Sequence, residues 1–335
     1  MSLLEVNHLC TSFFTASGEV KAVNDLSFSL DKGKVLGIVG ESGSGKSVTA
    51  YSILQILTHP GRIVSGSIRF HDEELVGKSD EEMRKIRGNR ISIIFQDPMT
   101  SLNPTFTIGN QLREAIMMHT NRNREQANQR AVEMLQMVGI SEPEKRIRQY
   151  AYELSGGMRQ RVMIAMALAC EPDILIADEP TTALDVTIQA QILELMMKLQ
   201  KELGMAIMMI THDMGVIASV CDEVIVMYAG GVCERGTTDA IFYHPKHEYT
   251  KGLMRSIPDM NDDQKTPLVP ISGTPIDLLK MPPGCPFAPR CDRAMKICLQ
   301  EKPKEYWVGR DHLSACWMNV KDGICSEERP QEEKT

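Results

Sequence analysis

A glycine-rich segment near the start of the chain restricts the possible folds of this protein more than any other feature of the sequence. The segment fits the pattern G-x-x-x-x-G-K-[ST] without a mismatch, and its residues are Gly40, Glu41, Ser42, Gly43, Ser44, Gly45, Lys46 and Ser47. Glycines at these points let the backbone curl, so that successive N–H groups can surround a phosphate. Such a loop normally joins a buried strand to a helix in an α/β sheet. The chain is therefore predicted to hold the phosphates of a nucleotide.

The residues on both sides of this loop agree with that prediction. The apolar run 35–39 is typical of a buried strand, and a helix is expected to begin near Lys46. The positive end of that helix would face the same anion. Lys46 would then bridge the β- and γ-phosphates, and the Ser47 hydroxyl would bind Mg²⁺. A glycine-rich turn with an incidental lysine is the simpler alternative, but it explains neither the strand nor the helix.

An acidic pair follows a second apolar run. Residues 174–177 are all aliphatic, and Asp178 and Glu179 come directly after them. Ligand groups collect at the carboxyl ends of strands in open α/β sheets. Asp178 is therefore a candidate to hold Mg²⁺, and Glu179 a candidate general base that polarises the attacking water. The alternative, a solvated strand end, is disfavoured by the four aliphatic residues and by the phosphate loop in the same chain.

Two further apolar runs have polar residues at their ends. The run 205–210 is followed by His212, and the run 91–95 is followed by Gln96. Neither side chain would indicate a function alone, because an isolated histidine is more often structural. Both become candidates because strand ends in such a sheet meet at one edge, beside the nucleotide.

Composition limits the class of protein. The chain has 335 residues, of which 42% are hydrophobic and 24% charged, as in a soluble domain with an extension. The formal net charge of −7 argues against a nucleic-acid partner. No apolar stretch approaches the ~18 residues of a membrane span. The first residues also lack the basic-then-apolar layout of a secretory signal. Membrane association is therefore expected to come through partners.

The tail carries a second chemical signal. Five of the nine cysteines lie between positions 285 and 325, and four of them follow C-x5-C-x6-C-x17-C, namely Cys285, Cys291, Cys298 and Cys316. Clustered thiols in a reducing compartment favour a metal over disulfides. Four thiolates suit either Zn²⁺ or a [4Fe–4S] cluster. The spacing matches neither the short zinc pattern nor a ferredoxin run, so both options, and unliganded or disulfide-forming cysteines, stay open.

At the level of whole segments, the chain resembles the ATP-binding subunits of bacterial ABC importers for dipeptides and oligopeptides. The resemblance covers about residues 3–318. It is carried by the two motifs above and by three segments that resemble the Q-loop, the signature and the D-loop of that family, which are residues 96–104, 154–161 and 183–185. One departure is Tyr-Ala-Tyr-Glu at 150–153, where the family usually has Tyr-Pro-His-Glu. It removes no chemical group that the site needs.

The resemblance implies a fold of class α/β, with a P-loop NTPase core of the ABC ATPase type. A mixed sheet with flanking helices is expected, together with a helical subdomain at about 97–172 that bears the signature. The nucleotide-binding domain would span 1–258, and a small cysteine-containing extension would span 259–335. A polar, proline-terminated segment at 259–267 is consistent with that boundary. Residues 111–118 and 125–138 have the apolar spacing of helices.

The resemblance also implies roles for further residues. Phe13 would stack on the adenine, Gln96 would bind Mg²⁺ and sense the γ-phosphate, and His212 would contact that phosphate. In a pair of subunits, the signature residues Ser155, Gly156 and Gly157 would face the partner's P-loop and its ATP. Asp185 of the D-loop would be a further nucleotide-binding residue. For the four tail cysteines, the resemblance favours a [4Fe–4S] cluster over Zn²⁺.

The implied function is ATP hydrolysis that energises the import of dipeptides or oligopeptides, the work of a translocase. The chain would lie at the cytoplasmic face of the bacterial inner membrane, beneath two permease subunits. A second ATPase subunit, either a related chain or the same one, and an extracytoplasmic peptide-binding protein would complete the system. No nucleic-acid partner is expected.

Three alternatives remain open. The same role could serve another cargo, such as nickel or glutathione. The chain could instead be a soluble ABC ATPase not tied to transport, or an ATP-gated switch that rarely hydrolyses. The presence of both Glu179 and His212 weighs against the last.

Overall fold

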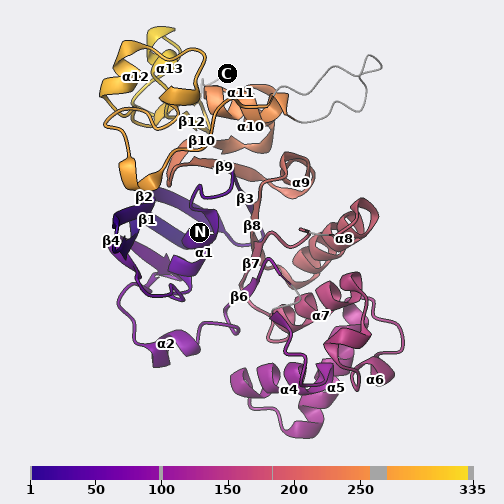
Figure 1. Cartoon of the computed structure of the whole chain (residues 1–335). Helices are drawn as coiled ribbons and strands as arrows, with labels where there is room; N and C mark the ends of the chain where they lie inside the picture. Colours follow the sequence, from indigo (N-terminus) through magenta and orange to yellow (C-terminus); the bar gives the residue numbers. More distant parts are fainter. Residues whose placement is uncertain (1, 98–100, 183, 257–269, 331–335) are drawn as a thin grey trace, which may run out of the picture. The chain divides into compact units, whose positions relative to one another are not determined.

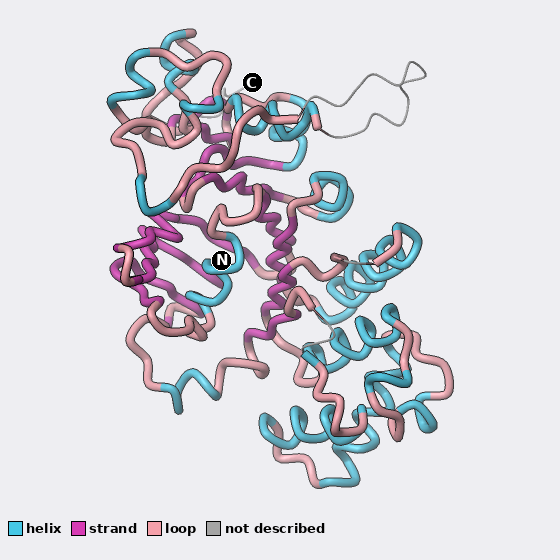
Figure 2. Tube along the Cα trace, viewed as in Figure 1, coloured by secondary structure: helices cyan, strands magenta, loops and turns pink. Residues whose placement is uncertain are grey.

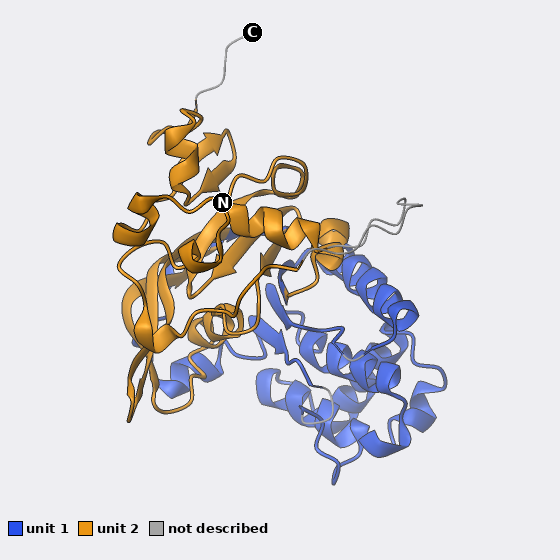
Figure 3. Ribbon diagram, turned by 45° about the horizontal axis from the view of Figure 1, so that its top comes forward, with its two compact units in different colours: residues 1–3, 30–34, 71–210 blue, residues 4–29, 35–70, 211–335 orange. Residues whose placement is uncertain are grey.

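The computed structural model of the chain describes residues 2–97, 101–182, 184–256 and 270–330. Two compact units are interleaved along the sequence (Figure 3). Unit 1 comprises residues 1–3, 30–34 and 71–210, and unit 2 comprises residues 4–29, 35–70 and 211–335. Parts of three predicted features lie outside the described residues: Q-loop positions 98–100, Ala183 of the D-loop, and the domain boundary at 259.

Unit 1 contains three parallel strands in the order β6-β7-β8, which are β6 (Ile91–Ile94), β7 (Ile174–Asp178) and β8 (Ala206–Thr211). Ile174 is paired with Ile91 on one side and with Ala206 on the other. Every residue of β7 and β8 is buried. Continuous apolar runs suit such strands because a parallel sheet is covered on both faces. These strands confirm three predictions made from the apolar runs.

Between β6 and β7, the described residues of unit 1 are mostly helical, as predicted, and their trace is drawn in cyan and pink in Figure 2. It contains α4 (Ile108–His119), α5 (Arg124–Met137), α6 (Pro143–Arg146), the 3-10 helix η1 (Ala151–Glu153) and α7 (Gly156–Leu168). Local capping explains two of the starts. The Thr107 hydroxyl accepts the N–H of Asn110, and Asn123 and Gln126 form a capping box. The other elements of unit 1 are β5 (Glu73–Glu74), α2 (Asp80–Arg84) and α8 (Val186–Leu203).

Unit 2 contains five strands of a mixed sheet in the order β11-β12-β10-β9-β3, with bounds β3 (Val35–Val39), β9 (Glu223–Tyr228), β10 (Gly231–Thr237), β11 (Tyr306–Gly309) and β12 (His312–Ser314). β3 and β9 run parallel, and the remaining neighbours run antiparallel. β12 pairs with β10, with Ser314 opposite Glu234. The C-terminal extension therefore continues the same sheet that carries the phosphate loop.

A second, antiparallel sheet of unit 2 contains β2-β1-β4, with bounds β1 (Ser2–Thr15), β2 (Gly18–Asp31) and β4 (Gly61–Phe70). In the β1–β4 pair, Leu4 lies opposite Phe70 and Val6 opposite Ile68. All four of these side chains are buried, so this face of the sheet forms part of the core.

The helices of unit 2 are mostly short (Figure 1). They are α1 (Lys46–Ile53), α9 (Met214–Val220), α10 (Thr238–Tyr243), α11 (Glu248–Arg255), η2 (Leu278–Lys280), η3 (Ala288–Arg290), α12 (Lys296–Gln300) and α13 (Trp317–Lys321). Three aromatic rings join the extension to the sheet. Tyr249 of α11 lies 4.8 Å from Tyr228 of β9, and 5.3 Å from Phe287 of the extension, between ring centroids. Within the described ranges, no helix is long and apolar enough to cross a bilayer.

Candidate functional site

The phosphate loop of unit 2 follows buried β3 and leads into α1, which begins at Lys46 as predicted. Two of its glycines are required by close packing. A Cβ on Gly40 would lie 2.2 Å from the Met227 carbonyl oxygen, and a Cβ on Gly45 would lie 2.3 Å from the Ala22 carbonyl oxygen. Both distances are shorter than any non-bonded contact. The path of the loop is therefore fixed by its neighbours in β9 and β2.

Lys46 folds back over the loop that precedes it. Its Nζ donates to the carbonyl oxygens of Gly40, at 2.7 Å, and Glu41, at 2.9 Å, and the side chain is 5% exposed. The ammonium charge therefore lies at the same loop as the N-terminus of α1. A lysine ammonium and the positive end of a helix at one loop suit a polyphosphate.

Glu41 is held by two residues from far along the chain. Its N–H donates to Tyr249 Oη at 2.8 Å, and its carboxylate accepts from both terminal nitrogens of Arg290, at 2.5 and 3.0 Å. Sequence reasoning missed both contacts. The partners are 208 and 249 positions from Glu41, and no local pattern links them.

The other predicted residues of unit 2 are Phe13 and His212. Phe13 lies in β1, half-buried, and its ring packs so closely over Gly61 that a Cβ there would lie 2.6 Å from it. His212 is exposed and follows β8. The next residue, Asp213, caps α9 by accepting the N–H of Gly215 at 2.8 Å. The roles of Phe13 at the adenine and His212 at the γ-phosphate stay predictions.

In unit 1, the acidic pair lies at the end of β7. Asp178 is its last residue and is 1% exposed. Glu179 has a φ of +48°, in the left-handed region, and its Oε2 accepts from Gln96 Nε2 and Thr182 Oγ1, both at 2.9 Å. The structure thus brings together Glu179 and Gln96, which the sequence singled out. It adds Thr182, which sequence reasoning missed.

The signature and D-loop residues lie at the starts of two helices of unit 1. The Ser155 hydroxyl caps α7 by accepting the N–H of Met158, and Asp185 caps α8 by accepting the N–H of Ile188. The signature serine is thus the N-cap of α7. A Cβ on Gly156 would meet no atom within 4 Å, whereas one on Gly157 would lie 3.0 Å from Ile188. Gly156 therefore faces open space within this chain.

The four tail cysteines lie in the extension. The Cys285 N–H donates to the Cys298 carbonyl oxygen at 2.8 Å. Burial raises the pKa of the Cys285 thiol to about 11, and it also raises the pKa of Cys291 and Cys316. The charge of other thiols of the set adds to each of these pKa shifts. Across the described residues, no three His, Cys, Asp or Glu side chains are placed to hold a metal ion.

Two family models match the chain. The model described as ABC transporter matches residues 23–182, and the model described as oligopeptide/dipeptide transporter, C-terminal region, matches residues 233–298. The second match includes three of the four tail cysteines.

Curated relatives and solved structures support the same family. The chain is 52% identical to the dipeptide transport ATP-binding protein DppD of Bacillus subtilis, over 94% of each chain. It is 50% identical to the oligopeptide transport ATP-binding protein OppD of Escherichia coli, over 96% of this chain and 94% of that one. The dimeric, post-hydrolysis structure of the ATP-binding cassette MJ0796 with ADP and Pi is similar at 27% identity. Its TM-score is 0.63, over 70% of this chain and 98% of that one.

Together the phosphate loop, the acidic strand end and these matches define an ATPase of the ABC transporter class. The predicted α/β fold of this class is confirmed. The chain belongs to the family of oligopeptide and dipeptide transport ATP-binding proteins.

Proposed function

We propose that this chain binds and hydrolyses ATP to energise the import of dipeptides or oligopeptides. The observation that carries the proposal is its identity of about half, over nearly the full length, with transport ATP-binding proteins for these two cargoes. The match of its C-terminal region to the peptide-transporter model supports the same cargo class.

The proposed roles at the ATP begin with the phosphates. Lys46 and the phosphate loop, residues 40–47, bind them, and Ser47, Asp178 and Gln96 would hold Mg²⁺, which would neutralise phosphate charge. The phosphate loop suits the phosphates, because its closely packed glycines have no side chains that would occupy the loop. Glu179 acts as the general base. The hydrogen bonds from Gln96 and Thr182 support this role, because they orient the Glu179 carboxylate.

A second ATPase subunit, either a related chain or another copy, is proposed to complete each site. Ser155, Gly156, Gly157 and Asp185 would face the partner's ATP. The open space around Gly156 supports this arrangement, since a phosphate could approach the backbone there. His212 and Phe13 would act at the γ-phosphate and the adenine of their own subunit.

The membrane partners are proposed to be two permease subunits, with the chain lying peripherally at the cytoplasmic face of the inner membrane. An extracytoplasmic peptide-binding protein would deliver the cargo. Exposed apolar side chains in unit 1 support a protein-binding surface there: Phe106 and Met117 are about half exposed, and Met118 and Tyr152 more so.

A [4Fe–4S] cluster held by Cys285, Cys291, Cys298 and Cys316 is proposed as a structural group, with Zn²⁺ as the alternative. The chemistry of the set supports the proposal, because thiolates are soft ligands and the backbones of Cys285 and Cys298 are joined by a hydrogen bond. Iron and inorganic sulfide in an anaerobic preparation, both lost in Cys291→Ser, are expected. A colourless preparation that contains zinc or no metal would contradict the cluster.

The transport proposal is tested by purifying the chain from its native membrane in detergent and identifying what accompanies it. Two multi-span permeases and a second ATPase are expected, with ATPase activity that rises when peptide and its binding protein are added. Stimulation by nickel or glutathione instead would correct the cargo. Recovery of ribosomes or DNA-binding proteins without permeases would overturn the proposal.

A further inference from the structure

The C-terminal extension reaches the phosphate loop through one side chain, Arg290. This residue ends η3, lies next to Cys291, and has a side chain that is 5% exposed. All five N–H groups of its guanidinium are paired. Nε donates to the Ser272 carbonyl, one terminal nitrogen to Glu41 and Tyr228 Oη, and the other to Glu41 and the Ile271 carbonyl.

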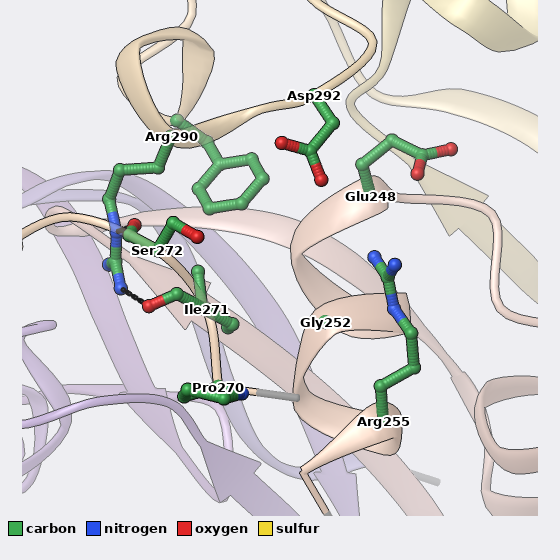
Figure 4. A pocket seen from close by; sticks show the side chains of 9 residues that line it. Glu248, Gly252, Arg255, Pro270, Ile271, Ser272, Arg290 and Asp292 are labelled. Carbon is green, nitrogen blue, oxygen red and sulfur yellow. Dashed lines mark hydrogen bonds between the residues drawn. The ribbon is translucent and has the colours of Figure 1, made fainter. Parts of the chain in front are cut away.

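The direction of this side chain is informative. In Figure 4, the Arg290 side chain reaches toward Ile271 and Ser272, while Asp292 and Glu248 lie across the pocket. These two acids are close in the fold, yet the carboxylate that Arg290 binds belongs to the phosphate loop. The pair is therefore a specific contact between the extension and the loop.

Glu41 connects that contact to the phosphate-binding lysine. Its carboxylate is bound by Arg290, its N–H by Tyr249, and its carbonyl oxygen by Lys46 Nζ. Every polar group of this loop residue is thus engaged, two of them by residues C-terminal to position 248. We propose that Arg290 is a positioning residue, which holds the phosphate loop in the conformation that binds ATP.

The chemistry of the pair suits this role. A guanidinium and a carboxylate that meet through two parallel hydrogen bonds fix each other's direction as well as distance. The Arg290 side chain is 5% exposed and that of Glu41 28%, so removal of Arg290 would leave a partly buried carboxylate without its charged partner and the loop would relax. A lysine in place of Arg290 would keep the charge and lose the fork.

A second contact of the extension supports the same inference. A hollow beside the loop is lined by Glu41, Ser42, Gly43 and Ser44 on one side, and by Pro275, Ile276 and Leu278 of the extension on another. The extension therefore lies beside the phosphate loop in addition to binding Glu41. Loss of either contact would free backbone that the phosphates need in one conformation.

The test measures the Kd of the full-length chain for MgATP and, separately, its thermal midpoint without nucleotide. The variants are Arg290→Met, Arg290→Lys and Glu41→Gln. Arg290→Met is expected to weaken ATP binding about tenfold, because the partly buried Glu41 carboxylate would lose its charged partner. Arg290→Lys should recover part of the affinity. The Arg290→Met, Glu41→Gln double variant should be no weaker than either single one, because both remove the same interaction.

Arg293→Met is the matched control, since Arg293 lies three residues away, is 51% exposed and pairs with Glu248 instead. Its Kd should match the parent chain. An unchanged Kd in Arg290→Met, with only a lower thermal midpoint, would show that Arg290 merely stabilises the fold and would overturn the proposal. If Arg290→Met does not fold, an unchanged Kd in both Arg290→Lys and Glu41→Gln would overturn it.

The inference rests only on the ATP-binding part of the proposed function. Binding of MgATP needs neither permease nor peptide, so failure of the peptide-transport assignment would leave this measurement intact. Failure of the parent chain to bind MgATP would instead contradict the proposed function itself.

Discussion

At the scale of single residues, Glu179 combines backbone strain with convergent hydrogen bonds. A non-glycine residue at φ +48° costs about 1–3 kcal/mol and persists only where its surroundings hold it. Here its N–H is bound by the Ile210 carbonyl at 2.8 Å, and its carboxylate accepts from Gln96 and Thr182. Strain held in this way, next to a buried aspartate, is typical of a functional position.

Glu179→Gln is expected to bind ATP normally and to lose hydrolysis by about 10²–10⁴-fold, the usual contribution of a general base. The amide keeps the size of the side chain and an acceptor oxygen for Gln96, but it cannot take a proton. Phosphate release in a single turnover and ATP binding are measured in parallel. Glu202→Gln, at an exposed position of α8, is the control. Near-normal turnover in Glu179→Gln would exclude Glu179 as the base.

Gly156→Ala and Gly157→Ala separate folding from assembly. Alanine at 156 meets no atom within 4 Å, so the thermal midpoint should be unchanged, while ATPase activity of the assembled pair should fall if a partner's phosphate approaches there. Alanine at 157 would crowd Ile188, at 3.0 Å, and should lower the midpoint as well. Full ATPase activity in Gly156→Ala would contradict the proposed contact.

At the scale of elements, the docking of the extension depends on a buried carboxylate. Glu234 of β10 is fully buried and accepts from the N–H groups of Lys246 and His247, and it contacts His312 Nε2 of β12 at 2.6 Å. The backbone pairing between β10 and β12 and the hydrogen bonds of Glu234 both attach the extension to β10. The edge strand of the sheet is thereby covered by the extension.

The start of α11 should make the stability of unit 2 depend on pH. His247 is buried, and its Nδ1 accepts the N–H of Tyr249 at 3.0 Å. Burial lowers its pKa to about 4, although Glu234 and Glu248 oppose the shift. In the unfolded chain the pKa is near 6.5, so the unfolded state binds the proton first as pH falls. The contribution of His247 is therefore complete above about pH 6.5 and is lost progressively toward pH 4, by about 3 kcal/mol.

Denaturant unfolding at pH 7 and pH 5 measures this effect. His247→Asn keeps an acceptor for the Tyr249 N–H but cannot titrate, so it should lose less stability between the two pH values than the parent chain. Equal losses in both proteins would show that other groups cause the pH dependence.

At the scale of the whole molecule, ATP should stabilise more than the loop that binds it. A ligand at about 100-fold its Kd adds about 2.7 kcal/mol to the free energy of unfolding. Because β3, β9, β10 and β12 belong to one sheet of unit 2, slower hydrogen exchange is expected to extend from the phosphate loop to the extension. Lys46→Ala should show neither effect. Protection confined to residues 40–47 would contradict the link between the two regions.

Much of the fold was predictable because its signals are local. Apolar runs of four to six residues mark β3, β6, β7 and β8, and each of these strands lies within a residue or two of the predicted bounds. The phosphate loop could be recognised because its glycines and its lysine must occur at fixed positions relative to one another. Helix starts at Ser155 and Asp185 follow from side chains that bind backbone within three residues.

The sequence by itself thus determined the class of fold, the nucleotide chemistry and the residues at strand and helix ends, since each depends on neighbours along the chain. Only the tertiary structure decided that Arg290 binds Glu41, that Thr182 joins Gln96 on Glu179, and that β12 extends the sheet of the phosphate loop. The charge of a side chain and the apolar pattern of a strand indicate which type of partner each of them requires. The particular partner depends on which residues the folded chain brings into contact. Those residues can be as many as 249 positions apart in the sequence, so no local pattern contains this information.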